Sequence, residues 1–376
     1  MAFLTGPRQV GKTTTCRSLK KNLYISWDND EDRSLILQGQ KALVNKIGLS
    51  EVSTIIFDEI HKYANWKNYI KGLYDSYGKN NFQIIVTGSA RFDVYRKGAD
   101  SLMGRYFLYR MHPLSVAEIL YQTYSKTEIR PPKKIADNDF NLLVRRGGFP
   151  EPFLRKNSRF YNKWKILRRQ LLFREDIRDV TKIHEIAQVE VLAELLKFQS
   201  SQLCNFASLA RKVRASENSI RSWTASLESL YYCFLLKPWS KNISRSLIKE
   251  PKVFLWDWSV VQDKGARYEN FIASHLLKAV HWWQDNGFGE YSLHYVRTKD
   301  KREVDFVVIK NNEPWFLVEV KSSRGKLSGN LKYFQKEINA KHAFQVTIDE
   351  AYVNKSCFDI SYPVIVPAKT FLSQLI

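Results

Sequence analysis

Apolar runs that end in polar residues mark the start of the chain. They lie in AFLTG at residues 2–6, STIIFDEI at 53–60 and FQIIVTGS at 82–89. Apolar runs of this length are typical of strands in a parallel sheet that is covered on both faces. The segment TTTCRSLKK after the first run is helix-like. The pattern therefore predicts a parallel α/β domain over residues 1–125.

Residues 126–200 read as a linker followed by helices. The stretch KTEIRPPKKIADND at 126–139 is charged and contains proline, which is typical of a linker. Beyond it, YNKWKILRRQLLFREDI and IHEIAQVEVLAELLKFQSSQL show apolar residues at helical spacing.

Residues 201–262 have the pattern of a winged helix. We expect a helix near 206–213, a turn at RASE and a second helix from about Glu217 to Leu230, which together make a helix-turn-helix. Strand-like FLLKPW and KVFLWDW then flank a basic loop. Base edges would be reached from the start of the second helix, by Asn218, Ser219, Arg221 and Ser222. Phosphate contacts are expected from Arg211, Lys212 and Arg214. Alternatively, such an element packs against protein.

Charged residues interrupt two apolar runs in REVDFVVIKNNEPWFLVEVKSS, residues 302–323. The runs predict two strands joined by a turn at NNEP. Asp305, Glu319 and Lys321 nevertheless stand where a buried strand is usually apolar, and burying an unpaired charge is costly. Glu319 and Lys321 share one face of their strand because side chains alternate along it.

A helix predicted over residues 265–285 brings a third acid, since Glu269 lies in its apolar stripe. Three carboxylates and a lysine then converge between a helix and a hairpin in the C-terminal part, residues 263–376. Carboxylate oxygens suit a hard divalent cation such as Mg²⁺ or Mn²⁺. The pattern predicts a metal site of Glu269, Asp305 and Glu319. Lys321 beside it would position or activate the attacking water, or would stabilise the negative charge that develops during the reaction.

The composition describes a globular, strongly basic protein. The 376 residues are 44% hydrophobic, which is enough for two to four domains with real cores. The net charge is +21, and residues 141–182 carry twelve Lys and Arg against four Asp and Glu. A polyanion is the natural partner, with nucleic acid the first candidate. A single basic run is equally compatible with a solvated helical face.

The cysteines and the hydropathy indicate the cellular compartment of the protein. Four scattered cysteines without CxxC spacing exclude a zinc ribbon and favour a reducing compartment. No apolar run approaches the length of a membrane span, and no signal peptide opens the chain. We therefore expect a cytoplasmic protein without a membrane partner.

The segment GPRQVGKT, from Gly6 to Thr13, fits the phosphate-binding pattern G-x-x-x-x-G-K-[ST] and stands between a strand and a helix. Backbone N–H groups of such a loop cradle phosphates. Lys12 would reach the β- and γ-phosphates, and the Thr13 hydroxyl would bind Mg²⁺. Asp58 and Glu59 end a later strand, where Asp58 would hold the Mg²⁺ and Glu59 would orient or deprotonate the attacking water. The expected nucleotide-binding set is Gly6, Gly11, Lys12, Thr13, Thr14, Asp58 and Ser89.

These motifs resemble a family of prokaryotic AAA+-type P-loop ATPases whose C-terminal half is catalogued as a domain of unknown function. After GPRQVGKT come SLMGR (101–105), PLSVAE (113–118) and GGFPE (147–151), in the order found in that family. The resemblance implies ATP and Mg²⁺ as cofactors and assembly through the ATPase domain. It also implies that Arg105 is an arginine finger, the alternative being an arginine paired with a local acid. Relatives carry a few dozen residues before the loop, so recognition of adenine is left open here.

The C-terminal set resembles the PD-(D/E)xK nuclease superfamily, with Glu269 on a helix, Asp305 in EVD, and Glu319 and Lys321 in EVK. The resemblance implies a metal-dependent endonuclease site, and the alternative is an inherited fold without activity. The fold class expected for the whole chain is multidomain α/β. It comprises a P-loop AAA+-type sheet, a helical segment, a winged helix and a nuclease-like domain.

The function expected from these parts is an ATP-hydrolysing protein that acts on nucleic acid, with DNA favoured over RNA. One alternative is an ATP-operated switch or scaffold that binds protein partners through an inactive nuclease fold. A sequence-specific regulator is a third reading, but nothing in a regulator needs the EVD and EVK set.

Overall fold

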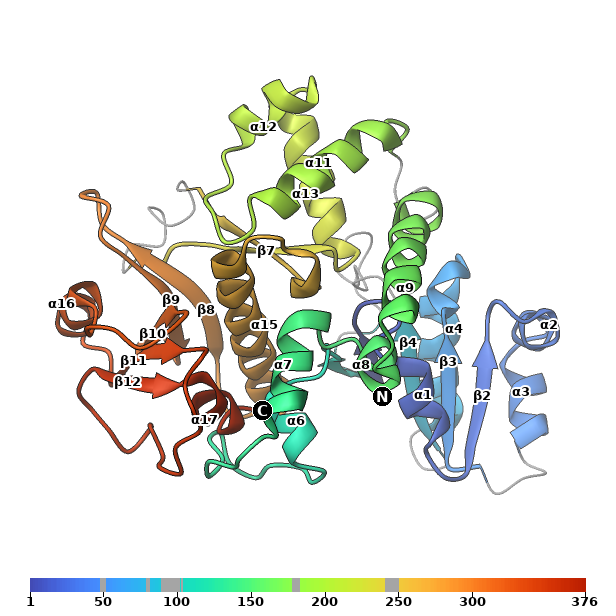
Figure 1. Ribbon diagram of the computed structural model, residues 1–376. Helices are drawn as coiled ribbons and strands as arrows, with labels where there is room; N and C mark the ends of the chain where they lie inside the picture. The colour runs from blue at the N-terminus through green and yellow to red at the C-terminus, as the bar shows by residue number, and fades with distance from the viewer. Residues whose placement is uncertain (48–51, 79–81, 89–101, 103, 178–182, 241–249) are drawn as a thin grey trace. The chain divides into compact units, whose positions relative to one another are not determined.

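The computed structural model describes residues 1–47, 52–78, 82–88, 102, 104–177, 183–240 and 250–376 (Figure 1). Contacts divide the chain into two units, Met1–His112 and Pro113–Ile376. The division falls before the boundary expected at residue 125, because residues 113–120 pack within the second unit. Among the described residues, no helix is both long and apolar enough to cross a membrane.

The described strands of the first unit form a five-stranded sheet in the order β2-β3-β4-β1-β5, with parallel neighbours throughout. The strands are β1 (Ala2–Thr5), β2 (Asn22–Ser26), β3 (Thr54–Asp58), β4 (Gln83–Gly88) and β5 (Phe107–Arg110). The helical elements are α1 (Lys12–Arg17), α2 (Asp30–Leu37), α3 (Gln40–Ile47), η1 (Ile60–Lys62), α4 (Trp66–Leu73) and η2 (Tyr74–Gly78). The expected parallel α/β domain is confirmed.

The core of the first unit comes from the apolar runs that predicted its strands. Phe3, Ile55, Phe57 and Val86 are fully buried in one cluster with residues of α2, α3 and α4. Because β1, β3 and β4 are parallel neighbours, their carboxyl ends lie at the same edge of the sheet. That edge holds the loop after β1 and the polar residues that end β3 and β4.

The second unit begins with helices. They are α6 (Val116–Leu120), α7 (Asp137–Arg146), α8 (Pro150–Arg155), α9 (Ser158–Leu171), η3 (Leu172–Asp176) and α11 (Ile186–Phe198). Next come α12 (Phe206–Val213), α13 (Glu217–Ser229), the strands β6 (Cys233–Leu236) and β7 (Lys252–Leu255), and η4 (Trp258–Val260). The two helices and two strands expected in this stretch are thus present. The strands pair antiparallel, and residues 241–249 between them lie outside the described part.

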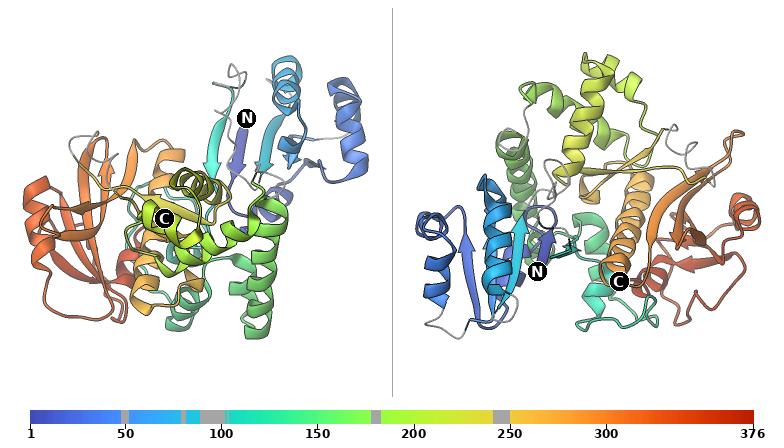
Figure 2. Two further views of the ribbon diagram at one scale, coloured as in Figure 1. Left: turned by 90° about the horizontal axis from the view of Figure 1, so that it is seen from above. Right: turned by 180° about the vertical axis from the view of Figure 1, so that it is seen from behind.

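A mixed sheet ordered β12-β11-β10-β9-β8 ends the chain (Figure 2). Its strands are β8 (Tyr291–Arg297), β9 (Glu303–Lys310), β10 (Glu313–Lys321), β11 (His342–Thr347) and β12 (Val364–Pro367). The accompanying helices are α15 (Lys264–Asp285), α16 (Gly329–Ile338) and α17 (Ala368–Ser373). The predicted hairpin is confirmed as β9 and β10. Asn311 and Asn312 both have positive φ, 49° and 68°, which is typical of a tight hairpin turn.

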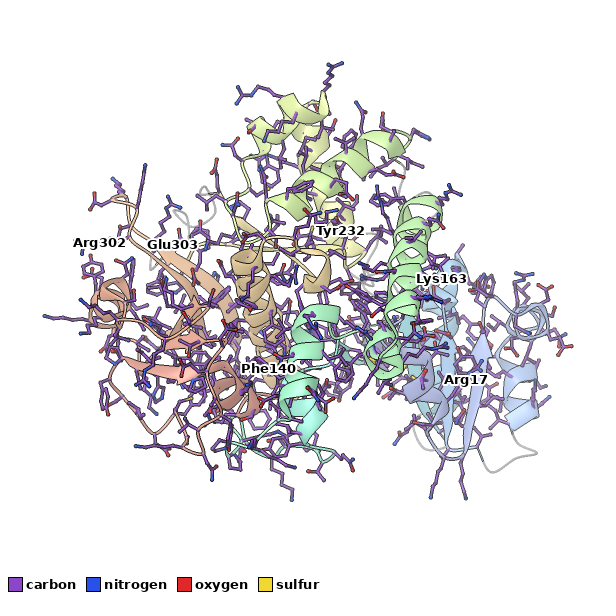
Figure 3. All side chains as sticks on the ribbon, viewed as in Figure 1. Arg17, Phe140, Lys163, Tyr232, Arg302 and Glu303 are labelled. Carbon is purple, nitrogen blue, oxygen red and sulfur yellow. The ribbon has the colours of Figure 1, made fainter. Side chains whose placement is uncertain are left out.

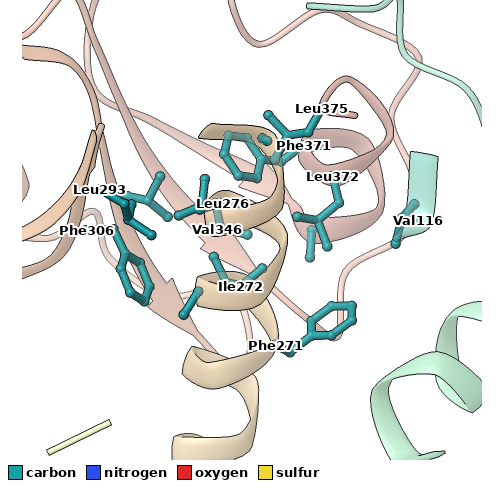
Figure 4. Close-up of a cluster of buried hydrophobic side chains, with 14 of the residues drawn as sticks. Val116, Phe271, Ile272, Leu276, Leu293, Phe306, Val346, Phe371, Leu372 and Leu375 are labelled. Atoms are coloured by element: carbon teal, nitrogen blue, oxygen red, sulfur yellow. The ribbon is translucent and has the colours of Figure 1, made fainter. Parts of the chain in front are cut away.

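Alternate side chains of the mixed sheet serve two cores. Phe306 and Val346 pack with Ile272 and Leu276 of α15 and with Phe371 of α17 (Figure 4). Val307, Ile309 and Leu317 instead pack with Leu331 and Phe334 of α16. The sheet is therefore covered on both faces, and α15, whose apolar stripe the sequence predicted, lies across one of them.

Candidate functional site

The loop after β1 folds back on itself around Lys12. The Lys12 side chain is buried, and its ammonium donates hydrogen bonds of 2.8 Å to the carbonyl oxygens of Gly6 and Pro7. Gly6 has a φ of 154°, and a Cβ there would collide with the carbonyl oxygen of Met111. Gly11 precedes α1 with a φ of 105°. The two glycines of the motif are thus required by a close approach and by a positive φ.

Asp58 collects hydroxyl donors from three elements at the carboxyl edge of the sheet. Thr13 Oγ1 of α1 donates to Asp58 Oδ2 over 3.3 Å, and Tyr24 of β2 and Thr87 of β4 also donate to this carboxylate. Burial and the hydrogen bond to Asp58 raise the pKa of Tyr24, so its hydroxyl stays protonated near neutral pH. Sequence reasoning did not assign Tyr24, and it placed Thr87 at the polar end of its strand without predicting its bond to Asp58. The pairing of β2 with β3, which brings Tyr24 close, had no signal in the sequence.

Glu59 follows Asp58 in a left-handed conformation, with a φ of 54°. A non-glycine residue in this region stores roughly 1–3 kcal/mol of backbone strain. Its amide donates to the carbonyl oxygen of Thr87 over 3.1 Å, which fixes the turn to β4. The Glu59 carboxylate lies 3.5 Å from Nε2 of His61. Burial lowers the pKa of His61, although Glu59 opposes the shift, so the ring is neutral near pH 7.

The donor set beside the loop suits Mg²⁺, because a hydroxyl and a carboxylate oxygen, those of Thr13 and Asp58, already face one another. Thr14 is exposed at the start of α1. Ser89 lies outside the described residues. Arg105 forms an ion pair with Asp75 of η2, with Nε 2.9 Å from Oδ1, and this contact raises the pKa of Arg105. The alternative of an arginine paired with a local acid is thus the arrangement seen here.

The four residues of the predicted C-terminal site lie on three elements of the second unit. Glu269 is on α15, Asp305 on β9, and Glu319 and Lys321 on β10. Asp305 Oδ2 accepts a hydrogen bond of 2.8 Å from the amide of Val320, and Lys321 Nζ lies 2.8 Å from Glu319 Oε1. Burial, together with the charge of Asp305, raises the pKa values of Glu269 and Glu319. The structure therefore brings the predicted acids close enough to repel one another.

A lysine that sequence reasoning did not assign lies among these acids. Lys252 of β7 places its ammonium 3.0 Å from Glu269, 2.6 Å from Glu303 and 3.8 Å from Asp305. Within the described part of the chain, no group of three His, Cys, Asp or Glu side chains is arranged to hold a metal ion. The structure thus does not support the metal set of Glu269, Asp305 and Glu319, because an internal cation already pairs with two of its members.

Some basic residues of the predicted winged helix and of the basic stretch 141–182 are engaged in contacts within the protein. Arg221 is bound to Glu217 over 2.6 Å and stacks on Phe206. Arg168 of α9 pairs with the buried Asp257 over 3.1 Å, and Arg169 lies 3.4 Å from Glu194. These side chains hold helices in place, so other basic residues are better candidates for contacts with a polyanion.

Models of known protein families match successive parts of the chain. The family model of the AAA domain matches residues 1–120. The first unit carries an AAA-type domain. Models of two domains of unknown function, DUF8612 and DUF4143, match residues 137–263 and 264–364. The AAA match agrees with the loop, Asp58 and the parallel sheet described above, and it supports binding and hydrolysis of ATP.

Two relatives that match most of the chain are uncharacterized proteins. An uncharacterized protein of Methanocaldococcus jannaschii is 26% identical over 345 residues, covering 84% of this chain and 72% of that protein. An uncharacterized protein of Mycobacterium tuberculosis is 23% identical over 350 residues, covering 88% and 73%.

Among solved structures, the Aeropyrum pernix Orc1 protein in complex with DNA aligns with a TM-score of 0.33 and 13% identity, covering 72% of this chain and 87% of that one. Thermotoga maritima RuvB, in a variant form, aligns with a TM-score of 0.30 and 14% identity, covering 62% and 80%.

Proposed function

We propose that this protein binds and hydrolyses Mg-ATP in its first unit and acts on nucleic acid, with DNA as the favoured substrate. The observation that carries the ATPase is the meeting of the phosphate-binding loop with Asp58, where Thr13 lies 3.3 Å from the carboxylate. The match to the AAA domain over residues 1–120 supports the same conclusion.

Each residue of this site has a defined part in the proposed reaction. Lys12 moves its ammonium from the loop carbonyls to the β- and γ-phosphates, and Thr13 and Asp58 hold Mg²⁺, which neutralises developing charge when bound. Tyr24 and Thr87 keep the Asp58 carboxylate in place by donating to it. Glu59 orients or deprotonates the attacking water. We also propose assembly into a homo-oligomer through this domain, as the resemblance implies.

The charge of the second unit supports nucleic acid as the partner. Residues 113–376 carry 42 of the 59 Lys and Arg and 28 of the 38 Asp and Glu, an excess of 14 positive charges. α9 contains five basic residues and no acid. Arg159 and Lys163 on this helix are exposed, and Lys163 projects from it in Figure 3. Such residues bind phosphates without reading sequence.

A salt titration of duplex DNA binding tests this proposal. Affinity should fall steeply with rising salt, because counterions are released on binding. The double variant Arg159→Glu/Lys163→Glu should lower the affinity of every duplex and reduce the salt slope. The matched control is Lys332→Glu/Lys336→Glu, which makes the same change in charge on α16. An affinity that does not change with salt would contradict the proposal, and equal losses in both variants would place the contacts elsewhere.

A second candidate function is an ATP-operated scaffold with an inactive nuclease fold. The pairing of Lys252 with Glu269 and Glu303 favours it, because it leaves the acids of the nuclease-like set without room for a metal. Incubation of supercoiled DNA with Mn²⁺ and ATP separates the two candidates. Cleavage that Asp305→Asn abolishes would establish the nuclease, whereas intact DNA supports the scaffold.

A further inference from the structure

Lys252 is almost completely buried in the centre of the acid cluster. Its side chain is 4% exposed, and it enters the cluster as the first residue of β7. Its ammonium contacts Glu269 of α15 and Glu303 of β9 and lies 5.7 Å from the centre of the Tyr295 ring. Glu303 begins β9, as Figure 3 shows. One cation is thus surrounded by groups from three elements far apart in the sequence.

The charge of Lys252 is stabilised by these neighbours. Burial alone would lower its pKa, but Glu269, Asp305 and Glu303 raise the pKa overall, so the side chain stays charged at any physiological pH. A buried ammonium without partners would cost several kcal/mol. In return, Lys252 offsets part of the repulsion among the acids, because its single positive charge faces three carboxylates within 4 Å.

A divalent cation does not fit the cluster while Lys252 is there. Mg²⁺ needs oxygen ligands at roughly 2.0–2.1 Å in a nearly octahedral arrangement, usually one or two carboxylates together with waters. Oxygens of Glu269 and Glu303 instead surround Nζ of Lys252 at 3.0 and 2.6 Å. Glu319 adds one more buried carboxylate oxygen to this region. Glu319 is 7% exposed, and within the described structure its buried Oε2 has no hydrogen-bond partner.

We infer that Lys252 is the resident cation of this acid cluster and takes the place of the divalent metal that the nuclease-like pattern implies. The cluster then joins β7, α15 and β9 through an ion network, and this cluster does not bind a divalent metal as folded here. The inference rests on the scaffold candidate above and is independent of the ATPase. It also explains how four acids are accommodated in one place: they pair with cations of the chain, because Glu303 also contacts Arg297 over 3.0 Å and Glu319 contacts Lys321 over 2.8 Å.

Removal of this one ammonium should create a metal site. Lys252→Met keeps a long apolar side chain but deletes the charge, which leaves Glu269, Glu303 and Asp305 without the cation that they share. We expect Lys252→Met to bind Mn²⁺ roughly tenfold or more tighter than the parent chain, because one positive charge has left a site of low dielectric. Lys321→Met, which removes a charge at the rim of the same cluster, is the matched control and should gain much less.

Mn²⁺ binding is measured by electron paramagnetic resonance of the free ion, on full-length chains without nucleotide. Asp58→Ala is present in every chain, so that the ATPase site does not contribute. The expected result is no binding at this cluster in the parent chain, and binding in Lys252→Met that a further Asp305→Asn removes. The inference is overturned if the parent chain binds Mn²⁺ in a manner that Asp305→Asn abolishes, or if Lys252→Met gains no affinity.

If Lys252→Met fails to fold, Mn²⁺ binding by the parent chain is compared with Mn²⁺ binding by Asp305→Asn. This comparison still tests the inference, because neither chain is changed at Lys252. ATP hydrolysis by the chain with an intact Asp58 is measured separately. Loss of that activity would reject the ATPase proposal and would leave the result at Lys252 unaffected.

Discussion

Replacement of Lys12 by alanine tests how the phosphate-binding loop works. In the structure its ammonium is already hydrogen-bonded to two carbonyl oxygens, each at 2.8 Å. When ATP binds, the Lys12 ammonium therefore exchanges these two neutral acceptors for charged phosphate oxygens. The gain comes from the difference between the two kinds of hydrogen bond. Exchanging the two neutral acceptors for charged ones gains about 2 kcal/mol in all, and the attraction of the phosphates at close range adds up to about 1 kcal/mol. We expect Lys12→Ala to weaken Mg-ATP binding by about 2–3 kcal/mol, roughly 30- to 150-fold in Kd.

Titration with a fluorescent ATP analogue in the presence of Mg²⁺ measures this loss. Lys41→Ala on α3 is the matched control, because it removes an exposed lysine from the same unit. Thermal unfolding followed by circular dichroism shows whether each variant is folded. A Kd for Lys12→Ala within about threefold of the parent chain would refute the reasoning, since it would mean that the ammonium stays on the loop carbonyls when nucleotide binds.

Three other changes test separate parts of the molecule. Glu59→Gln should leave Mg-ATP binding intact and slow hydrolysis, because it keeps the shape and removes the base; equal turnover of both chains would reject this role. Arg105→Ala should lower kcat no more than Asp75→Asn does, because the structure ties the two side chains together; a large fall in kcat with Arg105→Ala alone would instead identify an arginine finger. Leu276 is fully buried in the core between α15 and the mixed sheet. Leu276→Ala should therefore lower the free energy of unfolding by about 2–5 kcal/mol. Calorimetry of the second unit measures that cost, and a loss below about 1 kcal/mol would show that the core repacks.

Elements that have a strong periodic pattern could be predicted from the sequence. The helix expected over residues 265–285 is found at Lys264–Asp285, and the two helices of the expected helix-turn-helix at Phe206–Val213 and Glu217–Ser229. Polar strand ends at Asp58 and Thr87 meet at one edge because the strands are parallel. Local pattern was sufficient there, since a run of neighbouring residues determines each element. The roles of the site residues remain predictions.

The partners of a charge could not be predicted, because they depend on packing between distant segments. Lys252 stands at the edge of a short strand-like run, where a lysine is usually exposed to solvent. It is buried because β7 brings it to Glu269, 17 residues later, and to Glu303. Tyr24 likewise reaches Asp58 only because β2 pairs with β3. The acids of the C-terminal set indicated a cation, and the structure places the ammonium of Lys252 within 4 Å of two of them, Glu269 and Asp305.

The segment Pro113–Leu120 carries a motif assigned to the ATPase, yet its contacts belong to the second unit. Lys278 of α15 donates to the carbonyl oxygen of Pro113 over 2.9 Å and pairs with Glu118. His275 accepts from the amide of Val116 over 3.1 Å, and Ser115 donates to a main-chain oxygen of Ile376 over 2.8 Å.

Burial lowers the pKa values of Lys278 and His275, so the histidine is neutral and able to accept that hydrogen bond. The PLSVAE motif at residues 113–118 is therefore attached to α15, the helix that carries Glu269. It begins directly after His112, the last residue of the first unit. Within the second unit the segment is held by side chains of α15 on one side and by Ile376 on the other. This attachment gives a physical reason for a motif of the AAA-type domain to lie outside the sheet that binds nucleotide.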